Sequence, residues 1–596
     1  MPEPVTEYEK RLGNSLEIVA REDRAHRAVG SAKVAVVAVG LLMVWLCLSH
    51  ERVSPYWLFV LAASFFLLAG FHEIVLRAKA RAETLADFYR RGIARLQDRW
   101  IGFGQTGDRF RDPGHVYSED LDLFGKGSLF ELLSIARLPM GERRLADWLS
   151  TPSPLPVIAE RQQLVSELRE RLDLRENIAV AGTRLRPRLD PESLLLWAND
   201  GPALPGPLSR GLVAALAAAI CAGIVYYFLA SIFWPLAISL LLGLAVRQKL
   251  VKRAESTMHG VACNAEGLLA FAKILALLEK ESFSSPHLRE FTGRLKTSGI
   301  CASRAIRKLA AVVYWVDGHD SLLGHLAEIP ILYSLQVAFA ADAWRRRYGR
   351  SLQSWVDIAA EMEALLSLAC YSFEHPADPF PELQAAPDGA AIFRGEDLGH
   401  PLIPAAKCVA NSVRLDDRVR VLLVSGSNMS GKSTLLRAVG VNTVLAMAGA
   451  PVRAKTLSLT PLALGTRLRS ADSLQDGRSG FYTEILRLRV VFDLTANSLP
   501  LLFLFDELLE GTNSKDRKLA AEGLTKMLLR RRAIGIVTTH DLSLADIADS
   551  LDGKMANMHF EDQVRDGKMS FEYKLRDGVV TKSNAIELMR LIGFEL

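Results

Sequence analysis

The chain has 596 residues, a formal net charge of +5 and a mean hydropathy of +0.15, which is high for a soluble enzyme. This length has room for roughly three to five ordinary domains, and the nearly balanced charge excludes a uniformly basic nucleic-acid-binding chain. The six cysteines are widely separated without paired spacing, which argues against a disulfide framework or a zinc site.

The first apolar segments lie near the N-terminus. Residues 33–49 and 56–76 form two apolar runs, which follow a mixed-charge stretch. At about 1.5 Å per helical residue, each run approaches the ~30 Å hydrocarbon core of a bilayer. We expect a transmembrane helical hairpin within residues 1–100, and no cleaved signal peptide, because the first run begins about thirty residues into the chain.

A second apolar stretch lies within residues 208–250. Residues 211–246 contain no charged side chain, and as one helix they would be about 54 Å long, too long for a single crossing. A break at residues 231–235, which include Trp234 and Pro235, divides the stretch into passes over 211–230 and 232–246. The sequence therefore predicts a second transmembrane hairpin.

Basic residues flank the outer ends of both predicted hairpins, whereas Arg52 is the only lysine or arginine in the turns. The positive-inside tendency then predicts a multi-pass protein of the inner (cytoplasmic) membrane with its polar mass in the cytoplasm. Burial of these helices in the core of a soluble protein is the alternative interpretation, chiefly for the first pair. The flanking residues are Lys33, Arg77, Lys79, Arg81, Arg210, Arg247, Lys249, Lys252 and Arg253.

A phosphate-binding loop is predicted between a β-rich run at 419–425 and a helical run at 434–448. In the pattern G-x-x-x-x-G-K-S, backbone N–H groups and a helix N-terminus face the phosphates of a nucleotide. Lys432 would contact the β- and γ-phosphate oxygens and Ser433 would ligate Mg²⁺. The predicted ATP-binding residues are Gly426, Ser427, Asn428, Met429, Ser430, Gly431, Lys432, Ser433 and Thr434.

Two further strands carry the remaining predicted site residues. The apolar run 501–505 is typical of a strand buried on both faces of a parallel sheet, and it ends in Asp506 and Glu507. Asp506 would hold the magnesium ion, and Glu507 would orient the attacking water. A strand over 534–538 leads to His540, which would sense the γ-phosphate at the carboxyl edge of the same sheet.

A phosphate loop joined to membrane helices also fits a transporter ATPase. Such ATPases carry an LSGGQ-like signature between the phosphate loop and the Asp-Glu pair, and the two elements lie farther apart than here. This chain instead has "DSLQDGRSGFYTE" at residues 472–484. The segment between the two elements therefore argues against a transporter.

These residues resemble the ATPase domain of the MutS family of DNA mismatch-repair and recombination proteins. The loop containing Asn428 and Met429 looks like that family's G-x-N-M-x-G-K-S-T, and "DSLQDGRSGFYTE" is similar to its serine-containing signature. The resemblance continues through "GHPL" at 399–402, "DELLEGTNSKD" at 506–516, "TTH" at 538–540 and "YKLRDGVVTKSNAIELMRLIGF" at 573–594, where Asn584-Ala585 replaces the usual aromatic-glycine pair.

The resemblance implies an ABC-type P-loop ATPase domain over residues 381–596 that uses ATP and Mg²⁺. It also implies a homodimer through the ATPase domains, in which Ser479 of one subunit faces the nucleotide bound to Lys432 of the other. Residues 137–152 and 158–170 resemble the start of the MutS core, and 254–373 resemble its lever helices. We therefore expect a multi-domain α + α/β fold with core residues at 101–207 and lever/core helices at 251–380.

The functional expectation is a membrane-anchored MutS-family ATPase whose ATP-driven dimerisation moves helical levers to bind or handle DNA, as branched or repair and recombination intermediates, at the membrane; mismatch recognition does not carry over. No segment resembles the family's mismatch-reading wedge. A mechanochemical or transporter-like membrane ATPase, or a nucleotide switch acting on a protein partner, remains the alternative. The near absence of ionisable residues within the predicted passes favours an anchor over a conduit. The triplets Arg345–Arg347 and Arg530–Arg532 are interpreted as solvated helix faces.

Overall fold

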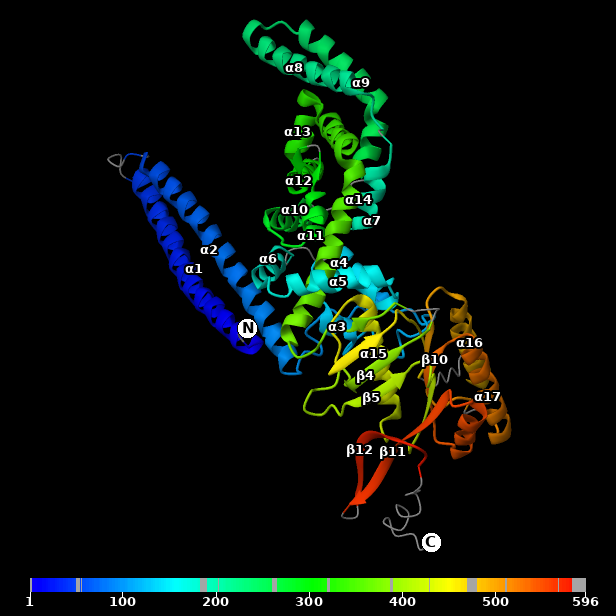
Figure 1. The fold of residues 1–596 in the computed structure, drawn as a ribbon. Coiled ribbons are helices and arrows are strands. Elements are labelled where there is room, and N and C mark those ends of the chain that lie inside the picture. Colours follow the sequence, from blue (N-terminus) through cyan, green and yellow to red (C-terminus); the bar gives the residue numbers. More distant parts are fainter. Residues whose placement is uncertain are drawn as a thin grey trace.

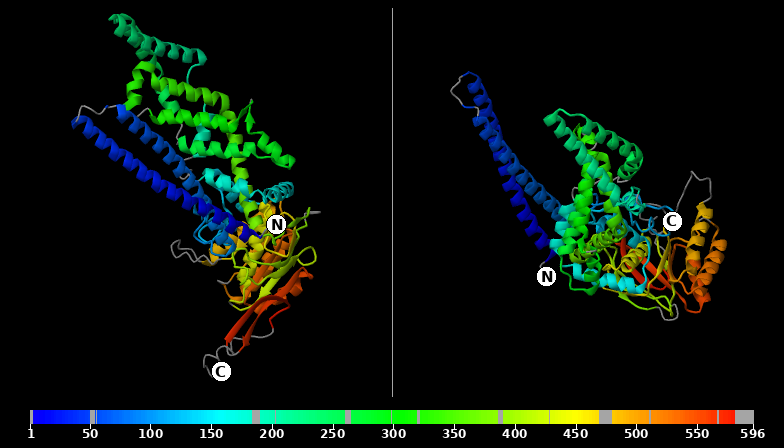
Figure 2. Two further views of the ribbon diagram at one scale, coloured as in Figure 1. Left: turned by 90° about the vertical axis from the view of Figure 1, so that its left-hand side faces the viewer. Right: turned by 90° about the horizontal axis from the view of Figure 1, so that it is seen from above.

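The computed structural model has helices over most of the first two thirds of the chain and two β-sheets in the last third (Figure 1). Both predicted hairpins extend from one end of the molecule, and the sheets lie at the other end (Figure 2). The structure describes residues 3–49, 54, 56–182, 190–201, 203–259, 265–297, 299–318, 322–385, 390–427, 429–468, 480–509, 512–565 and 568–580.

The first hairpin consists of α1 (Pro4–Ser49) and α2 (Tyr56–Leu96), which pack against each other along their length. Its base is attached to the last turn of α14 (Tyr333–Glu374). The rings of Tyr8, Tyr89 and Phe373 pack together there. Arg95 contributes a two-pronged contact to Glu374, at 2.6 and 2.7 Å. The hairpin is therefore anchored by a buried aromatic and ionic contact at one end only.

The second hairpin consists of α8 (Pro207–Ala230) and α9 (Trp234–His259). The helices separate at Ser231, which has a left-handed φ of 56°, so the break predicted at 231–235 is confirmed. Gly223 allows a close approach, because a Cβ added there would lie 3.0 Å from the Cα of Leu236. Apolar residues of this hairpin pack against the first turns of α14.

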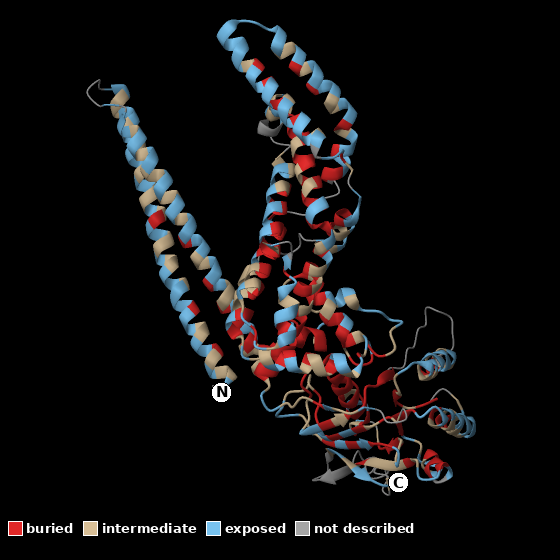
Figure 3. Ribbon diagram, turned by 45° about the horizontal axis from the view of Figure 1, so that its top comes forward, coloured by how far each residue is buried: buried red, intermediate tan, exposed pale blue. Residues whose placement is uncertain are grey.

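Among the described residues, four helices are long and apolar enough to cross a membrane, namely α1, α2, α8 and α9. The most apolar window of α1 is 0% buried and that of α2 is 6% buried, while those of α8 and α9 are 22% and 17% buried. Figure 3 shows the exposed upper parts of both hairpins. The alternative of helices buried in the core of this chain is therefore wrong.

Short helices fill the region between the hairpins and the sheets and pack around α14. Trp344 and Trp355 of α14 are buried among them. The region contains α3 (Leu129–Leu133), α4 (Pro139–Ser150), α5 (Leu155–Leu168), α6 (Leu172–Gly182), α7 (Pro191–Asn199), α10 (Ala265–Lys280), α11 (Pro286–Gly293), α12 (Ala302–Gly318) and α13 (Leu322–Ile331), with a 3-10 turn η1 (Asp108–Phe110) and the pair β1 (Lys296–Thr297) and β2 (Ile300–Cys301).

One of the arginine triplets is not a solvated face. Arg345 is buried and lies 2.8 Å from Asp342, with its guanidinium over the ring of Trp197. Arg346 also contacts Asp342, at 2.7 Å, and is partly exposed. The interpretation of 345–347 as a solvated face is therefore wrong for Arg345, because a carboxylate three residues earlier on the same helix lets its charge be buried.

The C-terminal domain contains a six-stranded and a four-stranded sheet. The larger has the order β12-β11-β6-β10-β9-β8, parallel except for the antiparallel β12, and the smaller has the order β3-β7-β4-β5. The strands are β3 (Glu382–Leu383), β4 (Phe393–Leu398), β5 (Asn411–Leu415), β6 (Val421–Ser425), β7 (Thr456–Leu459), β8 (Ala463–Arg467), β9 (Leu501–Phe505), β10 (Ile534–Thr539), β11 (Met555–Arg565) and β12 (Lys568–Asp577).

Helices of the C-terminal domain connect its sheets to the rest of the chain. The helix α15 (Lys432–Ala448) follows β6 and contacts β4 of the smaller sheet, β9 and β10 of the larger sheet, and α4 and α5. One continuous core cluster includes α4, α5, α14, α15 and strands of both sheets. The remaining elements are α16 (Gly480–Asp493), η3 (Leu494–Ala496), α17 (Ser514–Arg530) and η4 (Leu542–Leu551).

Candidate nucleotide site

The loop after β6 has the backbone that a phosphate-binding turn requires. All five residues of β6 are buried, and α15 begins at Lys432, so the strand and helix predicted on either side of the loop are present. Gly431 has a φ of +105°, which favours glycine, and a Cβ there would lie 3.1 Å from the ring of Tyr573. Met429 has a φ of +75° and is exposed, and Asn428 lies outside the described residues.

Lys432 lies across the inside of this loop. Its ammonium group donates hydrogen bonds to the carbonyl oxygens of Gly426 at 2.8 Å and Ser427 at 2.9 Å. The Nζ atom is also 4.0 Å from the Oε1 atom of Glu507. The side chain is buried, so a positive charge is held between the loop and the acidic end of β9.

Strand order explains why residues distant in sequence meet here. The strand β10 lies between β6 and β9, parallel to both, so the carboxyl ends of all three strands share one edge of the sheet. The Thr538 hydroxyl donates a hydrogen bond to the Oδ1 atom of Asp506 and accepts one from the backbone N–H of Glu507 at 3.1 Å. The Thr538 side chain, on β10, therefore fixes the positions of Asp506 and Glu507 at the end of β9.

The predicted catalytic residues Glu507 and His540 lie next to each other. The Nδ1 atom of His540 is 3.5 Å from the Oε1 atom of Glu507. Glu507 has a φ of +51°, an uncommon conformation for a residue with a side chain. Strained backbone of this kind concentrates at functional sites. Glu507 is thus a carboxylate held just after the end of β9, beside the imidazole of His540.

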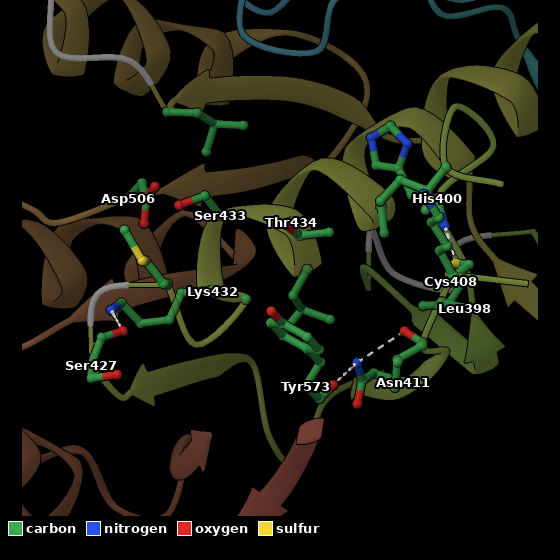
Figure 4. A pocket seen from close by; sticks show the side chains of 18 of the residues that line it. Leu398, His400, Cys408, Asn411, Ser427, Lys432, Ser433, Thr434, Asp506 and Tyr573 are labelled. Carbon is green, nitrogen blue, oxygen red and sulfur yellow. Dashed lines mark hydrogen bonds between the residues drawn. The ribbon is translucent and has the colours of Figure 1, made fainter. Parts of the chain in front are cut away.

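A cavity of about 710 Å³ connects these elements. Its wall includes Lys432, Ser433, Thr434, Asp506 and Glu507. In Figure 4 the hydroxyl of Ser433 points toward the carboxylate of Asp506. These are oxygen ligands of the type that Mg²⁺ uses together with waters and nucleotide phosphates. Within the described residues no group of three or more His, Cys, Asp or Glu side chains forms a metal site, and a nucleotide-bound Mg²⁺ does not need one.

Sequence reasoning gave no role to Tyr573, which lines the opposite wall of the cavity (Figure 4). The Asn411 side chain holds it there. Its amide nitrogen donates to the carbonyl of Tyr573 at 2.9 Å, and its Oδ1 atom accepts from the N–H of Leu575 at 2.8 Å. A partly exposed aromatic ring thus faces the phosphate loop from the antiparallel β12. The position of Tyr573 in the "YKLRDG" motif was the sequence signal that could have indicated a role at the site.

His400 is a second lining residue without a predicted role, although the "GHPL" motif contains it. It is buried, and its Nδ1 atom accepts a hydrogen bond from the N–H of Leu402 at 3.2 Å. Burial, together with the nearby Arg437 charge, lowers the pKa of His400 to about 4. The imidazole is therefore neutral at physiological pH and acts as a fixed structural acceptor.

The predicted signature serine, Ser479, lies outside the described residues. The end of the same motif is described, because Glu484 is buried near the start of α16. Its carboxylate accepts a hydrogen bond from the N–H of Leu509 at 2.8 Å and lies 3.3 Å from Arg467. Arg467 in turn donates to the carbonyl of Asp506 at 2.8 Å. The signature helix is therefore joined to the acidic end of β9.

A mostly parallel sheet with a glycine-bounded loop before a helix, and with an acidic pair at the end of a nearby strand, defines a nucleotide-binding α/β domain. Residues 422–595 match the family described as MutS domain V. The chain belongs to the MutS family, and this part of it is domain V, the ATPase domain of that family.

Each match to an individual protein covers only part of this chain and a smaller part of the relative. The chain is 35% identical over 262 residues to DNA mismatch repair protein MutS 1 of Halobacterium salinarum, covering 42% of this chain and 29% of the relative. It is 32% identical over 271 residues to MutS of Brevibacillus brevis, covering 44% and 30%. It is 28% identical over 345 residues to MSH6 of Arabidopsis thaliana, covering 54% and 24%. The chain thus spans under a third of these relatives' length.

Proposed function

We propose that this protein is an ATP hydrolase anchored in the inner membrane by two helical hairpins, with its ATPase domain in the cytoplasm, and that its nucleotide cycle moves α14 while the protein holds DNA. One observation carries the proposal. The phosphate-loop helix α15 packs on α4, α4 packs on α14, and α14 packs on the second hairpin and binds the base of the first through Glu374, which accepts hydrogen bonds from Tyr8 and Arg95. A change at the nucleotide therefore has a continuous packed path to both membrane segments.

Polar contacts strengthen the middle of this path. Glu363 of α14 accepts hydrogen bonds from the backbone N–H groups of Arg137 at 3.1 Å and Leu138 at 2.9 Å, where α4 begins. On the other side of the site, Arg437 of α15 contacts Asp122 at 2.6 Å. Because the buried Glu363 contact resists sliding more than apolar packing does, α4 and α14 are expected to move together. The partly exposed Arg437–Asp122 pair joins α15 to the loop before α3.

The nucleotide chemistry follows from the site. Lys432 and the loop N–H groups would bind the β- and γ-phosphates, and Ser433 with Asp506 would hold Mg²⁺, which neutralises phosphate charge when bound. Glu507 would orient the attacking water beside His540, at the 3.5 Å separation of these two side chains. The ring of Tyr573 offers an aromatic face to the nucleotide base. Hydrolysis at this site is the enzymatic part of the proposal.

Exposure of the hairpins supports the membrane part. Their apolar windows contact little protein, and water would not favour so large an exposed apolar surface. Aromatic residues concentrate at both hairpin tips, with Tyr56 and Trp57 on the first and Tyr227 and Trp234 on the second, all of them exposed. Trp and Tyr at a common level are typical of a membrane–water interface.

DNA binding is supported by one basic segment and by the printed names of the relatives, which are DNA mismatch repair proteins. Residues 289–308, covering parts of α11 and α12, contain a single acidic residue, Glu290. The six basic side chains of this segment are exposed, and such clusters bind nucleic-acid phosphates. They are Arg289, Arg294, Lys296, Arg304, Arg307 and Lys308.

ATP is further proposed to join two ATPase domains, with Ser479 of one subunit facing the nucleotide on Lys432 of the other. The link from Glu484 through Leu509 and Arg467 to the acidic end of β9 supports this, because it couples the signature segment to hydrolysis. A Ser479→Ala variant should bind ATP yet fail to dimerise in cross-linking of the detergent-solubilised protein.

The test is an ATPase assay of the solubilised full chain with duplex, branched and mismatched DNA. We expect at least one DNA to change the rate, with a salt-dependent affinity that falls in an Arg304→Glu/Lys308→Glu variant. A matched control is Arg489→Glu on α16, an exposed residue outside the basic segment. If the ATPase is active but no DNA binds or alters its rate, the DNA role is wrong and a membrane mechanochemical ATPase is favoured.

A further inference from the structure

An exposed apolar patch lies beside the second hairpin, outside the four candidate membrane helices. We define the α12–α13 patch as Tyr314 and Trp315 at the end of α12 with Leu326 and Ile329 on α13. Their exposed fractions are 68%, 55%, 66% and 61%. Residues of both helices pack on the same apolar cluster, namely Val312 and Val316 of α12 and Ala327 of α13. Large apolar side chains this exposed indicate a surface that meets something other than water.

The position of α13 along the second hairpin indicates what covers the patch. The Sγ atom of Cys221, on α8, donates a hydrogen bond to the carbonyl of Pro330 at 3.6 Å. Cys221 lies ten residues past Gly211, the start of the charge-free run, which corresponds to about 15 Å of helix. That is half of a ~30 Å hydrocarbon core. The end of α13 therefore lies alongside the apolar part of α8.

A polar contact fixes the other side of α13 at the edge of this region. Glu328 contacts Arg247 of α9 at 2.9 Å, and Arg247 is the first charged residue after the apolar run. Glu328 also accepts hydrogen bonds from the backbone N–H and the hydroxyl of Ser334, at 3.0 and 2.7 Å. The carboxylate of α13 thus faces the protein, whereas Leu326 and Ile329 are exposed beside the imidazole of His325.

The backbone geometry fits a segment that enters a bilayer and turns back. Together α13 and α14 are apolar enough for a broken span or a re-entrant loop, and they meet at a bend of 79°. Leu332 at the bend has a left-handed φ of 51° and is buried against the second hairpin. Irregular backbone is tolerated at membrane depth where protein satisfies it, as Cys221 does for Pro330 and Glu328 does for Ser334.

We infer that the α12–α13 patch lies in the cytoplasmic leaflet as a re-entrant element, covered by phospholipid. Its Tyr and Trp side chains suit the headgroup level and its Leu and Ile side chains suit the acyl chains. The inference rests on the proposed membrane anchoring and deepens it. It places the start of α14 within the cytoplasmic leaflet, so that motion of α14 acts on lipid directly and not through a loose tether.

Site-specific photocross-linking of the full chain in liposomes tests this. A benzophenone amino acid would replace Leu326 or Ile329 in separate variants, Leu241 on the exposed face of α9 as the anchor control, and Leu519 on α17 as the water control. All four positions are exposed apolar residues, so the variants are matched. Mass spectrometry would identify phospholipid adducts after irradiation.

We expect phospholipid adducts at Leu326, Ile329 and Leu241, with at least a tenfold lower yield at Leu519. Adducts at Leu241 without adducts at either α13 position would overturn the inference and leave the anchoring intact. Absence of adducts at Leu241 as well would overturn the anchoring itself. Cross-links from α13 to a second copy of the chain, in place of lipid, would also contradict the inference.

Discussion

The nucleotide site and the membrane hairpins are built on different physical grounds. At the site, a few side chains with defined partners do the work, as in the contacts that Thr538 makes with Asp506 and Glu507. The hairpins depend on distributed apolar surface, and little of their most apolar windows is buried. Single polar substitutions should therefore disable the site. The hairpins should tolerate most substitutions, except where they contact the rest of the chain.

The largest expected effect is at Glu507. Glu507→Gln keeps the size of the side chain but removes the charge that orients water, so ATP turnover should fall by about 10²–10⁴-fold. Membrane integration should not change. The measurement is steady-state ATPase activity of the solubilised protein, with Glu522→Gln on α17, outside the cavity, as the control. Unchanged turnover in Glu507→Gln would remove Glu507 from its assigned role.

The base of the first hairpin, like the nucleotide site, depends on a few polar side chains with defined partners. Burial alone would raise the pKa of Glu374, but the Arg95 charge outweighs burial and leaves that pKa below its usual value. Arg95→Ala would leave a buried carboxylate uncompensated, at a cost of about 3–5 kcal/mol. Hydrogen exchange at the base of α1 and α2 should then rise by 100-fold or more.

The control for this variant is Arg90→Ala on the same helix. Arg90 contacts Asp87 at 2.9 Å, with both side chains more than half exposed, so its loss should cost under about 1 kcal/mol. Equal exchange in the Arg95 and Arg90 variants would show that the first hairpin is attached by apolar packing alone.

The second hairpin should be most sensitive to substitution where α8 and α9 approach each other closely. Gly223→Leu places a side chain against the backbone of Leu236, 3.0 Å from the new Cβ, and should destabilise α8–α9 packing by about 1–3 kcal/mol. Gly40→Leu on α1 has nothing within 4 Å of the new Cβ and should be neutral. Thermal unfolding in detergent would compare the two, and a neutral Gly223→Leu would argue against this packing.

Tyr573 tests whether the site extends beyond the phosphate loop. Tyr573→Ala should weaken ATP binding by about 1–2 kcal/mol, or roughly tenfold in Kd, through loss of base stacking. Tyr573→Phe retains the ring and should bind ATP normally. Fluorescent-nucleotide titration measures both, and equal weakening in the two variants would assign the effect to the hydroxyl group.

The smallest expected effect is a pH dependence from His400. Its folded pKa of about 4 lies below the ordinary value near 6.5, so the folded state binds fewer protons than the unfolded state between these values. The stability that His400 contributes is therefore present above pH 6.5 and is lost as pH falls toward 4, by about 1 kcal/mol at pH 5.5. His400→Gln should lose less thermal stability than wild type between pH 7.5 and 5.5.

Sequence patterns predicted several strands of the site and the break in the second hairpin, but not the contacts that tertiary packing creates. The spans of β6, β9 and β10 and the break at Ser231 followed from apolar runs and turn residues. Tyr573 was missed because its place in the cavity depends on the pairing of β12 with β11 and on Asn411, contacts that no local pattern encodes. Arg345 was misread because its carboxylate partner and Trp197 are set by tertiary packing.

The re-entrant segment was missed for a related reason. Its apolar residues are few and are divided between the end of α12 and α13, so no run in the sequence reaches the length of a membrane pass. The contacts with Arg247 and Cys221, together with apolar packing of α13 on α8, place the segment beside the second hairpin. The polar partners that fix its level come from residues about 80 and 110 positions away in the chain.

The central claim is that nucleotide at Lys432 moves the two hairpins relative to each other through α14. Single-molecule energy transfer between dyes at Glu17 on α1 and Glu255 on α9, both exposed, tests it in nanodiscs with the Glu507→Gln protein. We expect ATP to shift the distance distribution and Lys432→Ala to abolish the shift. An identical distribution with and without ATP, in protein shown to bind nucleotide, would contradict it.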